Sequence, residues 1–244
     1  MPLKVAFLGA WHSHATMHVR EAAERPEEVE LMAMYDPEAE VIARNLERWA
    51  EYGLTIPVVP SQQDVLDSEA EVVIVEGHVY QNLNYAEAAL QAGKHVILEK
   101  PAGVDLDQLH RIHALAQEKK LHLNMAYMWR YNPAIQEILR LHAMGDLGQV
   151  CQYRGHIPKP KAWHKELALE YTLYHGAAYF EMAGHLIDLM VAFLGEPTRV
   201  LPALGRHYGE RQDVDNAMVI HECSDGLGMV DTTAMQIGMD RRVE

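Results

Sequence analysis

The chain has 244 residues, of which 49% are hydrophobic and 23% charged, a balance typical of a folded globular protein. Its formal net charge of −14 argues against nucleic acid as a partner, because phosphate backbones are bound by positive surfaces. A strand-like segment follows Met1 almost at once, and no apolar run is long enough to span a membrane, so neither a signal peptide nor a membrane contact is expected. The two cysteines lack metal-type spacing and favour a reduced, cytoplasmic protein.

Residues 1–125 alternate short β-branched runs with longer helical patterns, and the pair Asp105 and Gln108 resembles a capping box. Short apolar strands that are each followed by a helix predict a doubly wound parallel α/β sheet, the Rossmann architecture. The predicted strands are Lys4–Leu8, Val29–Tyr35, Val72–Val75, His95–Leu98 and, more weakly, His122–Met125, and the predicted helices are Ala15–Arg25, Pro37–Tyr52, Tyr85–Ala92 and Leu106–Lys119.

Residues 126–244 follow a different rhythm, which predicts a second, α+β domain with a mainly antiparallel open sheet. A polar stretch at Pro158–Lys165 interrupts its regular structure. The sequence ends inside what resembles a further strand, so either a small variant or an incomplete chain is expected. The predicted helices are Pro133–Met144 and Glu181–Phe193, and the predicted strands are Gln149–His156, Arg199–Gly205, Ala217–Glu222 and Gly228–Ala234.

The turn after the first strand, residues 9–14, occupies the place of a dinucleotide fingerprint G-x-G-x-x-G. Only Gly9 is kept, while Trp11 and His14 replace the second and third glycines. Asp36 ends the second strand, where a carboxylate accepts hydrogen bonds from a ribose hydroxyl and repels a 2′-phosphate, which favours NAD over NADP. Alternatively, Asp36 is a helix cap before Pro37.

Three histidines at positions 12, 14 and 18 lie close together in the sequence, and imidazole is a common metal ligand. No neighbouring carboxylate or cysteine in the sequence completes a ligand set, and the chain contains 15 histidines. We therefore expect no metal.

The predicted strand at His95–Leu98 runs into Glu99-Lys100-Pro101. Ligands of open α/β sheets bind at the carboxyl ends of the strands, so Lys100 is a candidate to steady a substrate hydroxyl by its charge. Pro101 favours an extended backbone at Lys100. The alternative is an ordinary surface lysine in a turn.

Four segments of the chain resemble the Gfo/Idh/MocA oxidoreductases. They are residues 92–101 with the Glu-Lys-Pro motif, residues 130–134 (Arg-Tyr-Asn-Pro-Ala), residues 145–150 (Gly-Asp-Leu-Gly-Gln-Val) and residues 176–189. The resemblance implies NAD(P)-dependent oxidation of a sugar or polyol hydroxyl, or the reverse reduction. It also implies a C-terminal sheet that often forms contacts within a homo-oligomer.

The resemblance also implies roles for residues of this chain. The family's lysine corresponds to Lys100, its acid/base histidine to His185, and the carboxylate four residues earlier to Glu181. His185 would take the hydroxyl proton while hydride leaves the same carbon, and Lys100 would steady the alkoxide. Glu181 and Asp188 share a helix face with His185 and can reach it; the alternative is a structural histidine satisfied by a helical carboxylate.

Both loops predicted to face the cofactor depart from the family pattern. They contribute Gly9, Trp11 and His12 after the first strand, and Gly77 and His78 after the third; Glu99 and Lys100 complete the predicted cofactor set. Three further residues, Arg130, Trp163 and Asp188, are candidates for substrate contact. Arg130 contacts substrate or anchors the crossing between domains, and Trp163 resembles a family Trp-Arg segment.

Two alternatives to a dehydrogenase remain open. In one, the chain is a glycosidase that holds NAD permanently and uses it transiently. In the other, it is a non-catalytic sugar or nucleotide sensor, which the reduced glycine loop favours and the retained Lys100 and His185 oppose.

Overall fold

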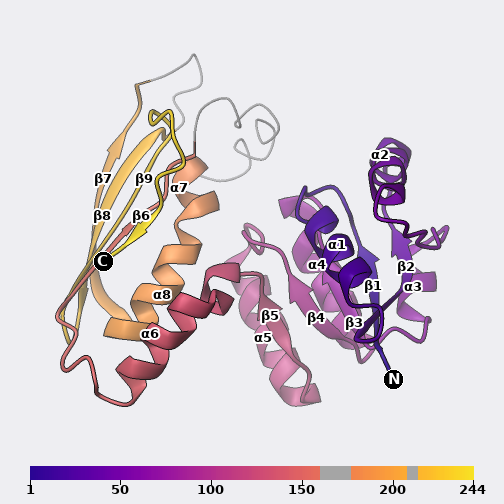
Figure 1. The fold of residues 1–244 in the computed structure, drawn as a ribbon, viewed down its shortest axis with the longest axis horizontal. Coiled ribbons are helices and arrows are strands. Elements are labelled where there is room, and N and C mark those ends of the chain that lie inside the picture. Colours follow the sequence, from indigo (N-terminus) through magenta and orange to yellow (C-terminus); the bar gives the residue numbers. More distant parts are fainter. Residues whose placement is uncertain (160–176, 208–213) are drawn as a thin grey trace. The chain divides into compact units, whose positions relative to one another are not determined.

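The computed structural model describes residues 1–159, 177–207 and 214–244, which form two compact units, Met1–Ala126 and Tyr127–Glu244 (Figure 1). The strands of the first unit form one wholly parallel sheet in the order β2-β1-β3-β4-β5, which confirms the doubly wound fold. Its elements are β1 (Leu3–Leu8), α1 (Ala15–Glu24), β2 (Val29–Tyr35), α2 (Ala39–Ala50), α3 (Gln62–Leu66), β3 (Val72–Val75), α4 (Val79–Gln91), β4 (His95–Leu98), α5 (Leu106–Lys119) and β5 (Leu123–Met125).

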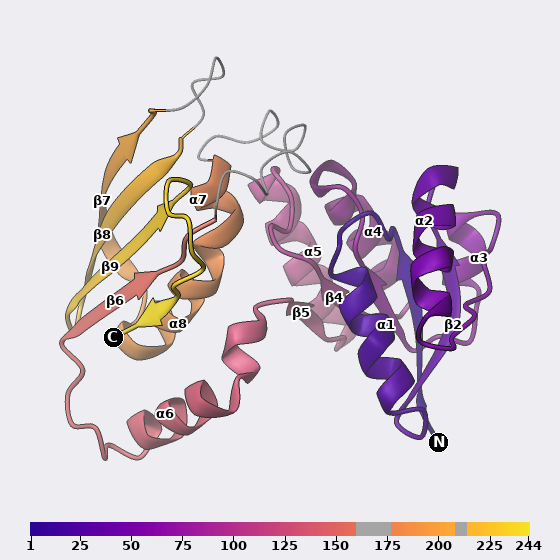
Figure 2. The same cartoon turned by 45° about the horizontal axis from the view of Figure 1, so that its top comes forward.

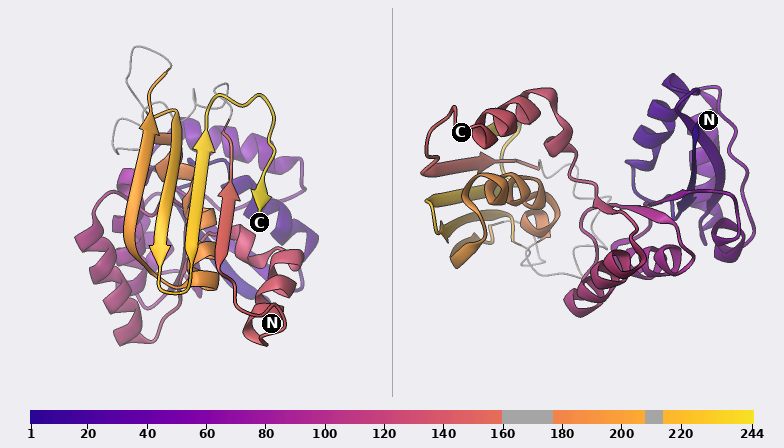
Figure 3. Two further views of the ribbon diagram at one scale, coloured as in Figure 1. Left: turned by 90° about the vertical axis from the view of Figure 1, so that its left-hand side faces the viewer. Right: turned by 90° about the horizontal axis from the view of Figure 1, so that it is seen from below.

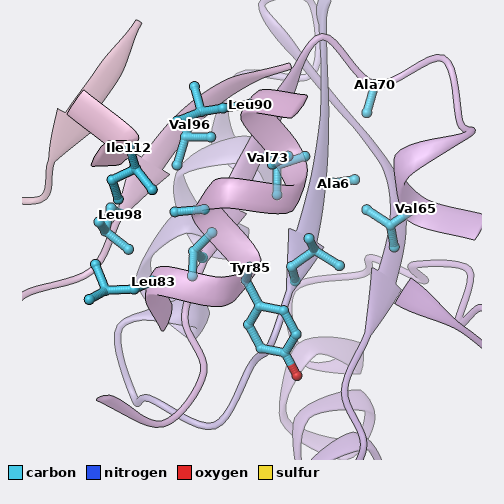
Figure 4. Close-up of a cluster of buried hydrophobic side chains, with 14 of the residues drawn as sticks. Ala6, Val65, Ala70, Val73, Leu83, Tyr85, Leu90, Val96, Leu98 and Ile112 are labelled. Carbon is cyan, nitrogen blue, oxygen red and sulfur yellow. The ribbon is translucent and has the colours of Figure 1, made fainter. Parts of the chain in front are cut away.

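Both faces of this sheet are buried, because alternate residues of β1 and β3 enter opposite hydrophobic clusters. Leu8 and Val75 belong to a cluster with α4 and α5, whose close-up includes Tyr85 and Leu98 (Figure 4). Phe7 packs on the other side with residues of α1 and α2. Strand β2 is added on one side of β1 and strands β3, β4 and β5 on the other. Ligands of such sheets bind at this switch point between β1 and β3.

The starts of α2, α3 and α4 differ from the sequence prediction, and the predicted single helix Glu181–Phe193 is two helices, Ala177–Met182 and Gly184–Leu194. Helix α4 begins at Val79 and not at Tyr85, and the backbone N–H of His78 reaches the side-chain oxygen of Gln81 at 3.4 Å in a capping box. Helix α3 was not predicted, and it begins with a capping box between Ser61 and Asp64. The first turn of α3 is polar, so its cap is the signal for its start, whereas in α4 the apolar period of Leu83 and Ala86 continues back to Val79.

The predicted capping box at the start of α5 is only half formed. Asp105 Oδ1 accepts a hydrogen bond from the backbone N–H of Gln108 at 2.9 Å. The side-chain amide of Gln108 instead donates to Asn84 Oδ1 and Glu87 Oε2, each at 2.9 Å. The glutamine therefore ties α5 to α4 across the surface of the unit.

The second unit contains a mixed sheet in the order β10-β6-β9-β8-β7. Only β6 and β9 pair in parallel, and the other neighbours are antiparallel, as the sequence predicts. Its elements are a 3₁₀ helix η1 (Met128–Tyr131), α6 (Pro133–Ala143), β6 (Gln152–His156), α7 (Ala177–Met182), α8 (Gly184–Leu194), β7 (Pro197–Gly205), β8 (Asn216–Cys223), β9 (Leu227–Thr233) and β10 (Arg242–Val243).

Helices α7 and α8 cover one face of this sheet (Figure 2). Leu186 and Met190 of α8 are fully buried against Tyr153 and Val230 of the sheet. The opposite face, toward the viewer in the left view of Figure 3, carries exposed apolar side chains that include Leu201, Met218 and Ile220. Within the described residues, no helix combines the length and the apolar character that a bilayer crossing requires.

Candidate active site

Four residues of the first unit directly follow parallel strands and therefore lie at one edge of the sheet. Gly9 follows β1, Asp36 follows β2, Glu76 follows β3 and Glu99 follows β4. The three carboxylates are at most 5% exposed. This edge concentrates buried negative charge at the place where an open α/β sheet binds its ligands.

The turn after β1 is packed closely against the turn after β3. Gly9 has φ +74°, and a Cβ at this position would lie 2.5 Å from Gly77 Cα, so only glycine fits. The backbone of Ala10 is fixed at both ends: its N–H donates to Asp36 Oδ2 at 2.8 Å, and its carbonyl accepts from Asn45 Nδ2 at 2.6 Å. The predicted tight turn is therefore present without the second and third glycines.

Trp11 and His78, both predicted to face a cofactor, come together from these two turns. Their rings stack with centroids 4.2 Å apart. His78 Nε2 also lies 2.7 Å from Glu38 Oε1. A bulky stacked pair thus occupies the place where a dinucleotide fingerprint has small residues.

Asp36 links the end of β2 to two backbone amides. Oδ1 accepts from the N–H of Glu38 at 2.9 Å, and Oδ2 accepts from Ala10. Burial raises the pKa of Asp36, although the hydrogen bonds from Ala10 and Glu38 oppose that rise. The bond to Glu38 holds the turn before α2, which begins at Ala39. The carboxylate of Asp36 can accept further hydrogen bonds, because each oxygen has two lone pairs.

The histidines after β1 meet Glu76 and Glu99, which the sequence did not reveal. His14 Nδ1 lies 3.1 Å from Glu99 Oε1, and His18 Nε2 lies 3.0 Å from Glu76 Oε1. His12 Nδ1 lies 3.5 Å from Glu76 Oε2 and 3.8 Å from Glu99 Oε1. The premise that no carboxylate completes a ligand set was therefore wrong, because the carboxylates come from strands that are distant in the sequence.

The two buried glutamates have opposite electrostatic environments. Burial, followed by the negative charge of Glu99, raises the pKa of Glu76 well above its ordinary value. Burial also opposes ionisation of Glu99, but His12, His14 and Lys100 outweigh it and lower the pKa of Glu99. The surroundings therefore favour ionisation of Glu99 over that of Glu76.

Lys100 is buried at the carboxyl end of β4, which contradicts the alternative of a surface lysine. The residue is 4% exposed, and its Nζ lies 3.9 Å from Glu99 Oε1. The peptide bond to Pro101 is cis. A buried ammonium beside a carboxylate at this edge is suited to stabilise negative charge on a bound substrate oxygen.

In the second unit, His185 is buried in the first turn of α8 among aromatic rings. The residue is 4% exposed, and its ring lies 5.7 Å from that of Tyr127 and 6.3 Å from that of Trp129. Tyr127 also packs against Gly184, where an added Cβ would lie 2.9 Å from Tyr127 Cε1. The aromatic surroundings fix the position of the imidazole.

The two carboxylates predicted to flank His185 both have basic partners. Glu181 Oε2 lies 2.9 Å from Lys159 Nζ, and Glu181 is 3% exposed. Arg130 binds Asp188 in a two-point ion pair, with Nε to Oδ2 at 2.8 Å and one terminal nitrogen to Oδ1 at 2.7 Å. Arg130 thus anchors the 3₁₀ helix η1 to α8 within the second unit.

Trp163, a predicted substrate contact, lies outside the described residues. Three residues at these sites, Glu76, Tyr127 and Lys159, were not predicted from the sequence. Glu76 had a visible signal, because it follows a buried strand in the same way as Asp36 and Glu99. Lys159 and Tyr127 had none, since their contacts with Glu181 and His185 depend on the tertiary fold.

Comparisons with known proteins agree with this architecture. Residues 3–127 match the GFO_IDH_MocA family, described as "Oxidoreductase family, NAD-binding Rossmann fold", and residues 135–244 match the "GFO/IDH/MocA C-terminal domain". The scyllo-inositol dehydrogenase from Lactobacillus casei, solved with NAD(H) and scyllo-inositol, has a similar fold. Its TM-score is 0.84 at 17% identity, over 100% of this chain and 73% of that one.

Curated relatives match this chain over only part of their own length. The "Uncharacterized oxidoreductase YdgJ" of Escherichia coli (strain K12) is 25% identical over 162 residues, which is 66% of this chain and 47% of YdgJ. A dTDP-3,4-didehydro-2,6-dideoxy-alpha-D-glucose 3-reductase of Actinomadura kijaniata is 23% identical over 172 residues, 70% of this chain and 50% of the reductase. The chain spans about half the length of these relatives. With both family domains matched along nearly its whole length, the chain belongs to the Gfo/Idh/MocA oxidoreductases.

Proposed function

We propose that this chain is a NAD-dependent oxidoreductase acting on a sugar, an inositol or a related polyol. Lys100 carries the proposal, because a buried lysine at the carboxyl end of β4, 3.9 Å from Glu99, belongs to a domain of the NAD-binding Rossmann family. Burying an ammonium is costly and is tolerated where the charge has a function or a close partner. The structural likeness to an inositol dehydrogenase supports the fold, and the family supports the reaction class.

The first unit has features that fit NAD. The turns at Gly9 and Gly77 lie at the switch point between β1 and β3, where neither residue has a Cβ to keep the two backbone segments apart. Asp36 ends β2 and has acceptor capacity for a ribose hydroxyl, while its charge disfavours a 2′-phosphate. We propose that Gly9, Trp11, His12, Gly77, His78 and Glu99 contact the dinucleotide together with Asp36 and Lys100.

The proposed chemistry divides between proton transfer and charge stabilisation. NAD, when bound, supplies the hydride acceptor. His185 accepts the proton of the substrate hydroxyl, and Lys100 stabilises the oxygen that loses it. Glu181 acts as a positioning residue for His185, and its pairing with Lys159 at 2.9 Å holds it in place. Arg130 and Asp188, which form an ion pair with each other, are proposed to lie near the substrate.

The outer face of the C-terminal sheet supports a homo-oligomer. Leu201 is paired with Ile220, and both are exposed on this face together with Met218. Exposed apolar patches of this kind mark protein interfaces.

The two free cysteines, Cys151 and Cys223, suit a reducing compartment such as the cytoplasm.

A second candidate function is a sensor that binds a sugar or nucleotide without turnover. The stacked Trp11 and His78 favour it, because they fill the place of the small residues that let a pyrophosphate approach. A glycosidase that retains NAD is the remaining family alternative.

One experiment separates these functions. NAD binding is first measured by calorimetry with the full chain, and NADH formation is then measured over a panel of sugars and inositols. The dehydrogenase predicts NAD binding together with NADH formation on at least one polyol. NAD binding without any turnover favours the sensor, and cleavage of glycosides by protein that co-purifies with NAD favours the glycosidase.

A further inference from the structure

We propose that His12, His14 and Glu99 form a binding site for a divalent transition-metal ion such as Zn²⁺ or Fe²⁺. The three residues each direct one ligand atom into a region where these atoms lie within 4.8 Å of one another. The proposal goes beyond the dehydrogenase function and does not depend on it, because all three residues belong to the first unit and no bound NAD is required.

The spacing of the ligand atoms fits a single ion. Two ligand atoms that each lie about 2.1 Å from a tetrahedral metal are separated by about 3.4 Å. Glu99 Oε1 lies 3.1 Å from His14 Nδ1 and 3.8 Å from His12 Nδ1. Both distances to Glu99 are therefore close to the separation of two ligands of one ion, and the three ligand atoms lie within 4.8 Å of one another.

The donor set has a recognised metal preference. Two imidazoles and one carboxylate hold Zn²⁺ in catalytic sites and Fe²⁺ in facial triads, in both cases with positions left open for water or substrate. His12 Nδ1 accepts a hydrogen bond from the backbone N–H of His14 at 3.3 Å, and a metal ion would replace this bond because it uses the same lone pair. An unprotonated imidazole nitrogen is the form that binds a metal.

Two buried carboxyl oxygens lie beside this cluster. Glu76 is fully buried and Glu99 is 1% exposed. Among the residues that the structure describes, neither Glu76 Oε2 nor Glu99 Oε2 receives a hydrogen bond. A buried carboxylate oxygen without a donor costs free energy, and a divalent ion beside Glu99 would remove much of this cost.

Glu76 is suited to an outer position around this site. Its Oε2 lies 3.5 Å from His12 Nδ1, and its Oε1 is occupied by His18 Nε2 at 3.0 Å. Carboxylates beside ligating histidines orient the rings and increase their basicity, and their loss weakens metal binding by about 10- to 100-fold. The position at the carboxyl ends of β1, β3 and β4 leaves the ion next to Lys100.

Cobalt provides a direct spectroscopic test, because Co²⁺ replaces Zn²⁺ in such sites and absorbs visible light when protein ligands bind it. The full chain is treated with a chelator, freed of it and titrated with Co²⁺, with the visible spectrum and calorimetry as readouts. We expect one ion per chain with ligand-field bands. His14→Gln should abolish these bands, and Glu76→Gln should weaken binding by about 10- to 100-fold.

The matched control is His113→Gln on the exposed surface of α5, which should bind Co²⁺ as the unchanged chain does. Circular dichroism establishes that each variant is folded, and Glu99→Gln replaces His14→Gln if the latter fails to fold. Absence of Co²⁺ binding by the unchanged chain would overturn the proposal. Equal binding by His14→Gln, Glu99→Gln and His113→Gln would also overturn it, because the ion would then lie elsewhere.

Discussion

The carboxylate of Asp36 holds the turn after β1 through the backbone N–H of Ala10, at a donor–acceptor distance of 2.8 Å. This bond joins the ends of β1 and β2, the two strands that flank the adenosine side of a dinucleotide site in Rossmann folds. Asp36 therefore has two separable roles, one in loop structure and one in proposed recognition of ribose.

Substitutions at Asp36 separate these roles. Asp36→Ala removes the acceptor for Ala10 and the charge, and we expect NAD affinity to fall by about 10- to 100-fold, as loss of a hydrogen bond to a charged group predicts. Asp36→Asn keeps an oxygen for Ala10 but loses the charge and the second acceptor for Glu38, so NADP should gain relative to NAD. Calorimetry with both nucleotides measures the change, and an unaltered preference in Asp36→Asn would show that Asp36 does not contact the ribose.

Arg130→Lys tests the anchor between η1 and α8. A lysine cannot reproduce the two-point pair with Asp188. Because Arg130 is partly exposed, we expect the free energy of unfolding to fall by only about 0.5–1 kcal/mol, measured by urea denaturation. Unchanged stability together with a raised KM would instead identify Arg130 as a substrate contact.

Gly184→Ala tests the aromatic surroundings of His185. The added methyl group would lie 2.9 Å from the ring of Tyr127, so the ring must move away from its place beside His185. We expect a loss of stability of about 1–3 kcal/mol from overpacking, and a larger loss of kcat than of NAD affinity. Gly238→Ala is the control, since nothing lies within 4 Å of its added methyl group, and equal effects of both changes would contradict the role of Tyr127.

His221 on β8 predicts an acid-sensitive second unit. Burial lowers the pKa of His221 below that of a free histidine, although contacts with backbone carbonyls oppose this. Above about pH 6.5 the side chain is neutral in both the folded and the unfolded chain, so it adds no pH dependence. Below that pH the unfolded chain binds a proton that the folded chain resists, and the free energy of unfolding falls until the native pKa is passed.

Denaturation across this pH range, compared with His221→Gln, measures the effect. The glutamine variant does not titrate, so its stability should depend less on pH below about 6.5. Parallel pH profiles for the two proteins would show that His221 does not contribute.

Much of the fold was predictable because its strands are short and mainly apolar, and β3 and β4 are rich in β-branched residues. Strands β2, β3 and β4 and helix α5 have the bounds that the sequence predicts. The beginning of α4 was missed although Val79 is in period with Leu83 and Ala86, and the cap at His78 marks its start.

The candidate sites show the same division. Lys100 and His185 were identified from motifs, and each proves to be buried. The cluster of His12, His14 and Glu99 was not identified, because His14 and Glu99 are separated by 85 residues and meet only when β1 and β4 enter one sheet. Long-range contacts of this kind have no signal in one sequence beyond the acidic residue that follows each strand.

The most direct test of the proposed dehydrogenase is the rate of NADH formation by Lys100→Met and His185→Ala, on the polyol that gives the highest rate with the unchanged chain. Loss of charge stabilisation or of the proton acceptor predicts a fall in kcat of about 10²- to 10³-fold in each variant. NAD affinity of His185→Ala should remain within a few-fold of the unchanged chain. Rates equal to that of the unchanged chain in both variants would contradict the assignment of Lys100 and His185 to the reaction.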